Sequence, residues 1–209
     1  MTRAGAGAAE GRHDRPVRVV ALAASAGGLA SLTAVLTRLP ADFPAAVVVL
    51  QHLPAHHPSQ LTRVLVRIST LPVQEAADGD RLLPGRVYVA PPGRHLAVEP
   101  GGVLGLRDTA PVHFVRPSAD VLFTSLTRVL GACAIAVVLS GRGEDGAQGA
   151  AAVHAAGGTV IAEAAATAGA FDMPAAAIAS GGVDLVLRAD EIADALVRLV
   201  AMGVGDEHA

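Results

Sequence analysis

The fold can be inferred first from residues 17–28, which read Val-Arg-Val-Val-Ala-Leu-Ala-Ala-Ser-Ala-Gly-Gly. The nearly continuous apolar run from Val17 to Ala23 predicts a buried strand, and the small residues after it predict a tight turn. Leucines then recur at helical spacing. They are Leu29, Leu32, Leu36 and Leu39. A buried strand that turns directly into a helix is typical of a parallel sheet covered by helices.

The same alternation of strands and helices returns along the chain. Further strands are predicted at 45–50, 134–139, 159–162 and 183–187, and helices at about 58–68, 117–130, 147–156, from 173, and 190–202. Between residues 73 and 106, short apolar pieces separated by turn residues predict antiparallel hairpins at a sheet edge. We expect a doubly wound three-layer α/β fold: a mostly parallel sheet with helices on both faces and an antiparallel hairpin excursion.

Length and composition limit the organisation of the chain. Its 209 residues suit one domain, expected at 16–203, after a disordered leader at 1–15 and before a flexible tail at 204–209. The leader lacks the apolar stretch of a secretory signal, and no segment supplies the roughly 20 apolar residues that span a bilayer. We therefore expect a cytoplasmic protein without membrane insertion.

Charge and cysteine content exclude several functions. The net charge is −3, and no block of lysine or arginine forms the basic patch of a nucleic-acid-binding protein. Cys133 is the only cysteine, which excludes a disulfide framework and a cysteine-based zinc site.

Three polar residues follow predicted strands of the sheet. Ser25 follows the first strand, His52 the second, and Asp145 the strand at 134–139. Ligands of open parallel sheets bind beyond the carboxyl ends of the strands. A serine, a histidine and an aspartate there suit nucleophilic acyl transfer, because the imidazole takes the hydroxyl proton and the carboxylate fixes the imidazole tautomer.

Each of these residues also has a plainer interpretation. Ser25 and Asp145 could simply be N-cap residues of the helices that follow them. His52 could join His56 and His57 in a metal site, but no carboxylate or cysteine lies nearby in the sequence, so we expect no metal.

Nucleotide-binding and hydrolase motifs fit poorly. Residues 141–146 are glycine-rich but lack the lysine and Ser/Thr of a P-loop. Gly27-Gly28 is the only support for a nucleotide-binding Rossmann module, without the full G-x-G-x-x-G motif. Ala23 replaces the first glycine of the α/β-hydrolase motif Gly-x-Ser-x-Gly, and the order serine, histidine, aspartate differs from that class.

From about Val17 to Val200 the chain resembles the catalytic domain of the chemotaxis protein-glutamate methylesterases, the CheB family. The matching segments, which occur in family order, are 24–28, 51–54, 78–93, 116–120, 139–146 and 171–174. Several motifs in order are far more specific than any one of them.

The resemblance implies a carboxylic ester hydrolase. Ser25 would be the nucleophile, His52 the general base and Asp145 the acid that orients it. The implied substrate is a methylated chemoreceptor-like protein, whose glutamyl methyl esters are hydrolysed in chemotaxis-type signal transduction. Deamidation of receptor glutamine is the implied companion activity, and no cofactor is expected.

Departures from the family pattern surround the implied oxyanion site. The N–H groups of Ala26 and Arg142 are the expected oxyanion donors, with Gly27 beside them in the cleft. The family usually has threonine and methionine at the positions of Ala26 and Arg142, and an acidic segment where this chain has alanines at 164–166. These changes motivate an alternative function, a catalytically weak or inactive adaptor that binds a receptor or response regulator.

The resemblance covers the catalytic domain alone. Family members of the chemotaxis pathway carry an N-terminal phosphorylatable receiver domain, for which these 209 residues leave no room. We therefore expect no control by phosphorylation within the chain, and a separate response regulator is a candidate partner.

Overall fold

The computed structural model describes residues 18–53 and 59–202. The predicted leader and tail lie outside the described residues, as do His56, His57 and the expected start of the second helix near Pro58. No helix in these two described ranges is long and apolar enough to cross a membrane.

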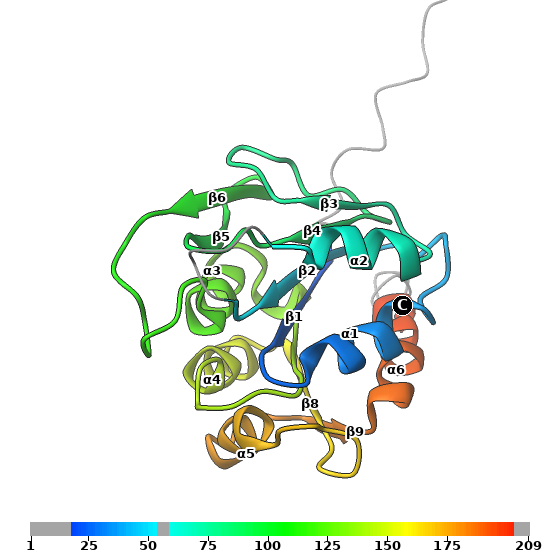
Figure 1. Cartoon of the computed structure of the whole chain (residues 1–209), viewed down its shortest axis with the longest axis vertical. Helices are drawn as coiled ribbons and strands as arrows, with labels where there is room; N and C mark the ends of the chain where they lie inside the picture. The colour runs from blue at the N-terminus through cyan, green and yellow to red at the C-terminus, as the bar shows by residue number, and fades with distance from the viewer. Residues whose placement is uncertain (1–17, 54–58, 203–209) are drawn as a thin grey trace, which may run out of the picture.

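The core of the protein is a seven-stranded sheet in the order β3-β4-β2-β1-β7-β8-β9 (Figure 1). Every neighbouring pair of strands is parallel. The strands are β1 (Val19–Ala24), β2 (Ala46–Gln51), β3 (Val73–Glu75), β4 (Val87–Val89), β7 (Ala134–Val138), β8 (Thr159–Glu163) and β9 (Leu185–Leu187). The mostly parallel sheet expected from the sequence is confirmed.

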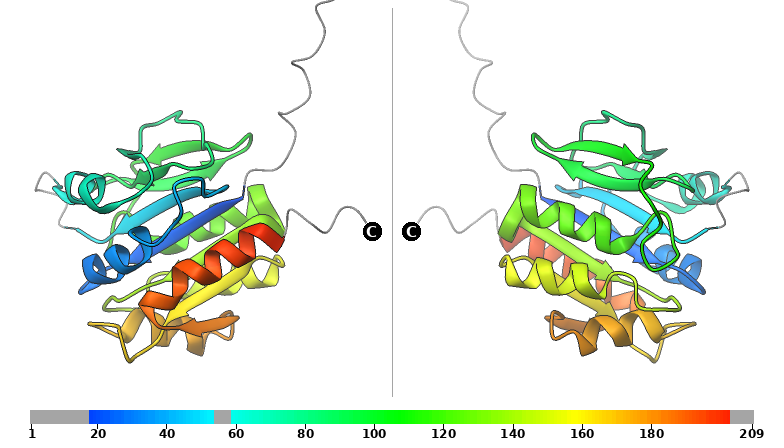
Figure 2. Two further views of the ribbon diagram at one scale, coloured as in Figure 1. Left: turned by 90° about the vertical axis from the view of Figure 1, so that its right-hand side faces the viewer. Right: turned by 90° about the vertical axis from the view of Figure 1, so that its left-hand side faces the viewer.

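Helices cover both faces of this sheet, as Figures 1 and 2 show. The helices α1 (Gly28–Leu36), α2 (Leu61–Ile68) and α6 (Ala189–Met202) lie on one face, and α3 (Ala119–Leu130), α4 (Ala147–Ala155) and α5 (Asp172–Ala179) on the other. Strand β1 is fully buried because it serves both layers: Val20 and Leu22 pack toward α1, whereas Val19 and Ala21 pack toward α3. Its unbroken apolar run reflects this burial on both sides.

The middle of the chain corrects part of the expected pattern. Strands β3 and β4 are parallel members of the main sheet rather than parts of a hairpin. Only β5 (His95–Glu99) and β6 (Val103–Arg107) form an antiparallel hairpin, which packs against α3. Strands β3 and β4 have only three residues each, which is too short for the sequence pattern to indicate whether they pair in parallel or antiparallel. The turn residues around them therefore suggested hairpins that do not form.

The connections of the sheet identify a topological switch point. From β1 the chain crosses to β2 and the β3 edge, and it later returns to the other side of β1 with β7. Beyond the carboxyl end of β1 the connections on either side therefore diverge, and ligands of doubly wound sheets bind at such switch points. Ser25, His52 and Ser140 all lie just beyond β1, β2 and β7 at this end.

Candidate active site

Ser25 directly follows β1, between the ends of β2 and β7, the two strands that flank β1. Ala24 pairs with Gln51 in the β1–β2 register, so Ser25 and His52 are the next residues on adjacent strands. The His52 N–H donates to the Ala24 carbonyl at 3.0 Å, and the Ser25 N–H donates to the Ser140 carbonyl at 2.9 Å. These bonds hold Ser25 at the switch point, where its side chain is half-buried.

A tight turn joins Ser25 to α1. Gly27 is the N-cap residue of this helix with φ of 77°, a left-handed conformation that favours glycine, and no side chain caps the helix. At Gly28 a Cβ atom would lie 2.5 Å from the Cβ of Ala24, so the helix starts close against the strand. The Ser25 side chain is therefore not the helix cap that its position before α1 suggested.

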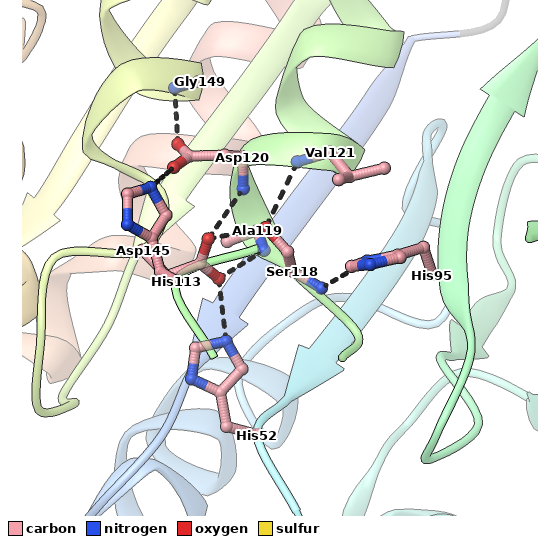
Figure 3. Close-up of polar contacts among 9 residues, drawn as sticks. All are labelled: His52, His95, His113, Ser118, Ala119, Asp120, Val121, Asp145 and Gly149. Carbon is pink, nitrogen blue, oxygen red and sulfur yellow. Dashed lines mark hydrogen bonds and ion pairs between the residues drawn. The ribbon is translucent and has the colours of Figure 1, made fainter. Parts of the chain in front are cut away.

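His52 and Asp145 form a buried polar pair (Figure 3). The Nε2 atom of His52 lies 2.8 Å from Oδ2 of Asp145, and the two side chains are 9% and 3% exposed. Because Nε2 is held by the carboxylate, Nδ1 is the ring nitrogen left to accept a proton from another group.

The Asp145 carboxylate binds the first turn of α3. Its Oδ1 accepts from the Ser118 hydroxyl at 2.6 Å and from the Asp120 N–H at 3.3 Å, and its Oδ2 accepts from the Ala119 N–H at 2.6 Å. Its side chain does not cap α4, the helix that follows it, because Gly146 is the N-cap residue there and makes no side-chain cap. The carboxylate instead satisfies donors at a different helix N-terminus, where negative charge is favoured.

These contacts decide the charge of Asp145. Burial by itself raises the pKa of its carboxyl group, but hydrogen bonds from His52, Ser118 and Ala119 outweigh the burial and leave the pKa below its usual range. Asp145 is therefore ionised at neutral pH and can stabilise a positive charge on the imidazole.

A second buried carboxylate, Asp120, lies beside this pair. Burial raises its pKa, and the nearby charge of Asp145 adds to that effect. Its Oδ1 accepts from the Gly149 N–H at 2.7 Å, and its Oδ2 lies 3.2 Å from Nε2 of His113. The other ring nitrogen of His113 lies 3.3 Å from the Glu144 carboxylate, so His113 links α3 to the loop that carries Asp145. No local sequence pattern indicates this cluster.

The loop after β7 is joined to the Ser25 turn through Ser140. The Ser140 hydroxyl donates to the Ala26 carbonyl at 2.7 Å and accepts from the Ala170 N–H at 2.9 Å. Its own N–H donates to the fully buried carboxylate of Glu163 at 2.9 Å. Ser140, held by Glu163, therefore stabilises the turn that follows Ser25. The sequence does not indicate this role.

Gly141 brings the loop into contact with Ser25. A Cβ atom at Gly141 would lie 2.9 Å from the Ser25 Cβ and 2.2 Å from the Met173 Sδ, so only glycine fits without rearrangement. The Met173 N–H also donates to the Gly141 carbonyl at 3.0 Å. Met173, from the segment 171–174 that matches a family motif, is fully buried and thus packs against the loop that contacts Ser25.

The expected oxyanion donors, the N–H groups of Ala26 and Arg142, make no hydrogen bond to another group in the described part of the chain. Ala26, Gly27 and Arg142 are all exposed, and they lie beyond the carboxyl ends of β1 and β7. The N–H groups of Ala26 and Arg142 are therefore free to bind an oxygen atom of a ligand.

The structure brings together part of the expected Ser-His-Asp arrangement. His52 and Asp145 are bonded, and Ser25 is adjacent through the backbone, but no hydrogen bond joins the Ser25 hydroxyl to His52 within residues 18–53 and 59–202. Contacts of this kind are often long before a substrate binds. Over the same ranges no three His, Cys, Asp or Glu side chains gather closely enough to hold a metal ion, and His56 and His57 lie outside them.

A parallel α/β sheet with a serine, a histidine and a buried aspartate at its carboxyl edge has the arrangement of a serine hydrolase. The CheB methylesterase family model matches residues 20–196. The chain therefore belongs to the CheB methylesterase family.

Individual relatives agree with this assignment. A protein-glutamate methylesterase/protein-glutamine glutaminase of Moorella thermoacetica is 42% identical, and the match covers 94% of this chain and 47% of the relative. A protein of the same name from Anaeromyxobacter dehalogenans is 46% identical over 86% of this chain and 53% of its own length. The chain thus spans about half the length of the curated relatives it matches.

A solved structure matches most of the chain. The crystal structure of the CheB methylesterase catalytic domain of Thermotoga maritima is 37% identical and superposes with a TM-score of 0.85. The match covers 88% of this chain and 100% of that domain. The expected fold class and family are both confirmed.

Proposed function

We propose that this protein is a serine esterase that removes methyl esters from glutamate side chains of a chemoreceptor-like protein. The observation that carries the proposal is the bonded pair of His52 and Asp145 beside the turn that holds Ser25. The names of the relatives, protein-glutamate methylesterase/protein-glutamine glutaminase, support the choice of substrate.

The mechanism has two steps. Nδ1 of His52 takes the Ser25 hydroxyl proton as Oγ attacks the ester carbonyl, and the imidazolium then gives this proton to the departing methoxide, which leaves as methanol. Water next attacks the acyl-enzyme, with Nδ1 again as base, and releases the glutamate carboxyl group and free Ser25. The ionised Asp145 stabilises the imidazolium in both steps.

The exposed N–H groups of Ala26 and Arg142 are the proposed oxyanion donors. Backbone donors are independent of the side chain, so the methionine and threonine usual in the family are not required for this role. The Arg142 side chain is exposed at the same place and would attract an acidic segment around the ester.

The same chemistry would deamidate glutamine, with ammonia leaving in place of methanol, which agrees with the second part of the relatives' names. A separate response regulator as partner, a cytoplasmic location and action without a cofactor complete the proposal.

Methanol release from a methylated receptor helix tests this function. The wild-type protein should release methanol and Ser25→Ala should not. Thr37→Ala is the matched control, because its hydroxyl donates only to the Thr33 carbonyl at the far end of α1. Release by Ser25→Ala at the wild-type rate would contradict the proposal.

One observation favours a second candidate, an adaptor that binds a receptor or response regulator without catalysis. The exposed residues Ala26 and Arg142 replace the threonine and methionine usual in the family beside the proposed nucleophile. An adaptor would bind the methylated helix and leave its esters intact, so the methanol assay also distinguishes the two functions.

A further inference from the structure

We propose that Ser118, supported by the buried ring of His95, is a positioning residue that orients the Asp145 carboxylate toward His52. The inference rests on the proposed function, because it assigns a role within the same site. Residues 116–120 form one of the motifs that match the family, but their sequence indicates no chemical role.

A chain of hydrogen bonds links these residues (Figure 3). The Ser118 hydroxyl donates to Oδ1 of Asp145 at 2.6 Å, while Oδ2 of the same carboxylate faces Nε2 of His52 at 2.8 Å. The two oxygens of Asp145 thus have separate partners. Oδ1 also accepts from the Asp120 N–H at 3.3 Å and Oδ2 from the Ala119 N–H at 2.6 Å. Rotation of the carboxylate would break these bonds, so the Ser118 hydroxyl acts together with the two backbone donors to fix the direction in which Asp145 presents Oδ2 to His52.

His95 holds Ser118 in place from the other side. Its Nδ1 accepts from the Ser118 N–H at 3.1 Å, and its Nε2 lies 3.0 Å from the Ala110 carbonyl. Because a backbone N–H only donates and a carbonyl only accepts, these two bonds require a proton on Nε2 and none on Nδ1. The His95 and Ser118 side chains are both fully buried, so no water can replace these partners without rearrangement.

Ser118 also has an ordinary structural role, which a test must separate from positioning. It is the N-cap residue of α3 and accepts a long 3.4 Å hydrogen bond from the Val121 N–H. A hydroxyl that only caps the helix would not need to donate to Asp145. The shorter 2.6 Å bond to a charged acceptor is the stronger of the two.

The test compares substitutions at Ser118 by two measurements. Ser118→Ala should lower kcat about tenfold with KM unchanged, the effect of one hydrogen bond to a charged group. By proton NMR, the His52 N–H that faces Asp145 should exchange with water about ten times faster than in the wild type.

Three variants distinguish a loss of Asp145 orientation from a general loss of fold stability. Ser118→Thr keeps the hydroxyl and should restore both measurements. Ser118→Gly removes the hydroxyl, but glycine is a tolerated N-cap residue, so this variant should stay folded with the defects of Ser118→Ala. Ser125→Ala in the same helix removes a hydroxyl that accepts from the Val98 N–H, so it should lower stability without changing either measurement.

The outcomes distinguish this inference from the proposed function. If the His52 N–H exchanged at the wild-type rate in both Ser118→Ala and Ser118→Gly, the positioning role would be overturned, even in an active enzyme. If the wild-type protein releases no methanol, the proposed function fails, while the proton exchange still decides whether Ser118 orients Asp145.

Discussion

Nε2 of His52 lies 2.8 Å from Oδ2 of Asp145, although 93 residues separate them in the sequence. In chymotrypsin-type proteases the carboxylate holds Nδ1 and Nε2 acts as base. Here the two ring nitrogens exchange these roles, because Nε2 is bonded to the carboxylate. The base that would activate Ser25 is therefore Nδ1, and the Nε2–H tautomer is the one that Asp145 favours.

The first prediction follows from this tautomer. Asp145→Asn places an amide opposite His52 that can donate to Nε2 and thereby favour a proton on Nδ1, which removes the base. We expect kcat for methanol release to fall by about 10³–10⁴-fold with KM little changed. Steady-state kinetics measure this effect, and a loss smaller than about tenfold would show that the carboxylate does not fix the tautomer.

The second prediction concerns acid stability. Because the pKa of Asp145 is lowered in the folded protein, its charged form stabilises the fold above the ordinary aspartate pKa of about 3.9, and this contribution is lost as pH falls through the lower folded value. The wild type should be more stable than Asp145→Asn by about 2 kcal/mol at pH 7. Urea unfolding from about pH 7 to pH 3 should show this advantage shrinking in the acid range; a constant advantage would contradict the lowered pKa.

Asp120 should behave in the opposite way. Its pKa is raised chiefly by burial, so its contribution to stability is present below the unfolded pKa and is lost as pH rises through the folded value. Asp120→Asn keeps an oxygen that can accept from the Gly149 N–H and removes the buried charge. Its thermal midpoint should equal or exceed that of the wild type at neutral pH and lose this advantage on acidification. A large destabilisation at pH 7 would instead show that the contact with Nε2 of His113 dominates.

The close packing around Gly141 gives a prediction about stability. Gly141→Ala forces its new methyl group against Met173 and Ser25, so we expect a loss of roughly 1–3 kcal/mol in the free energy of unfolding and a large fall in kcat. In a Met173→Ala background the same substitution should cost less stability, while the contact with Ser25 still disturbs activity. Equal costs in both backgrounds would mean that Met173 is not the obstacle.

Arg142 gives a prediction about specificity. Arg142→Met, which introduces the residue usual in the family, should leave kcat nearly unchanged because the backbone donor remains. KM for a receptor peptide with acidic flanking residues should rise several-fold, and the effect should shrink as salt increases. Peptides with neutral flanks are the control, and an equal change in KM for both would exclude charge recognition.

Much of the fold could be predicted because its signals are local. The apolar runs of β1, β2 and β7 are each long enough to identify buried strands, and the tight turn at Gly27 follows from small residues alone. The direction of β3 and β4 could not be predicted, because strand pairing depends on partners far away in the sequence.

Only those site residues that directly follow a predicted strand could be predicted from the sequence. Ser25, His52 and Asp145 each follow a strand, so their proximity could be expected. The partners of Asp145 could not, because its carboxylate binds α3, which precedes it in the chain, rather than α4, which follows it. Ser140 and Glu163 could not be predicted for a similar reason: their contacts join segments far apart in the sequence, and no local pattern indicates them.

Labelling by a fluorophosphonate tests the central claim, that His52 makes the Ser25 hydroxyl nucleophilic, most directly. Mass spectrometry of the intact protein and its peptides would measure one adduct per chain and its position. We predict an adduct on Ser25 in the wild type and a much slower reaction in His52→Ala, with the remote variant Thr37→Ala unchanged. An adduct that forms on Ser25 equally fast without His52, or none on Ser25 in the wild type, would contradict the account.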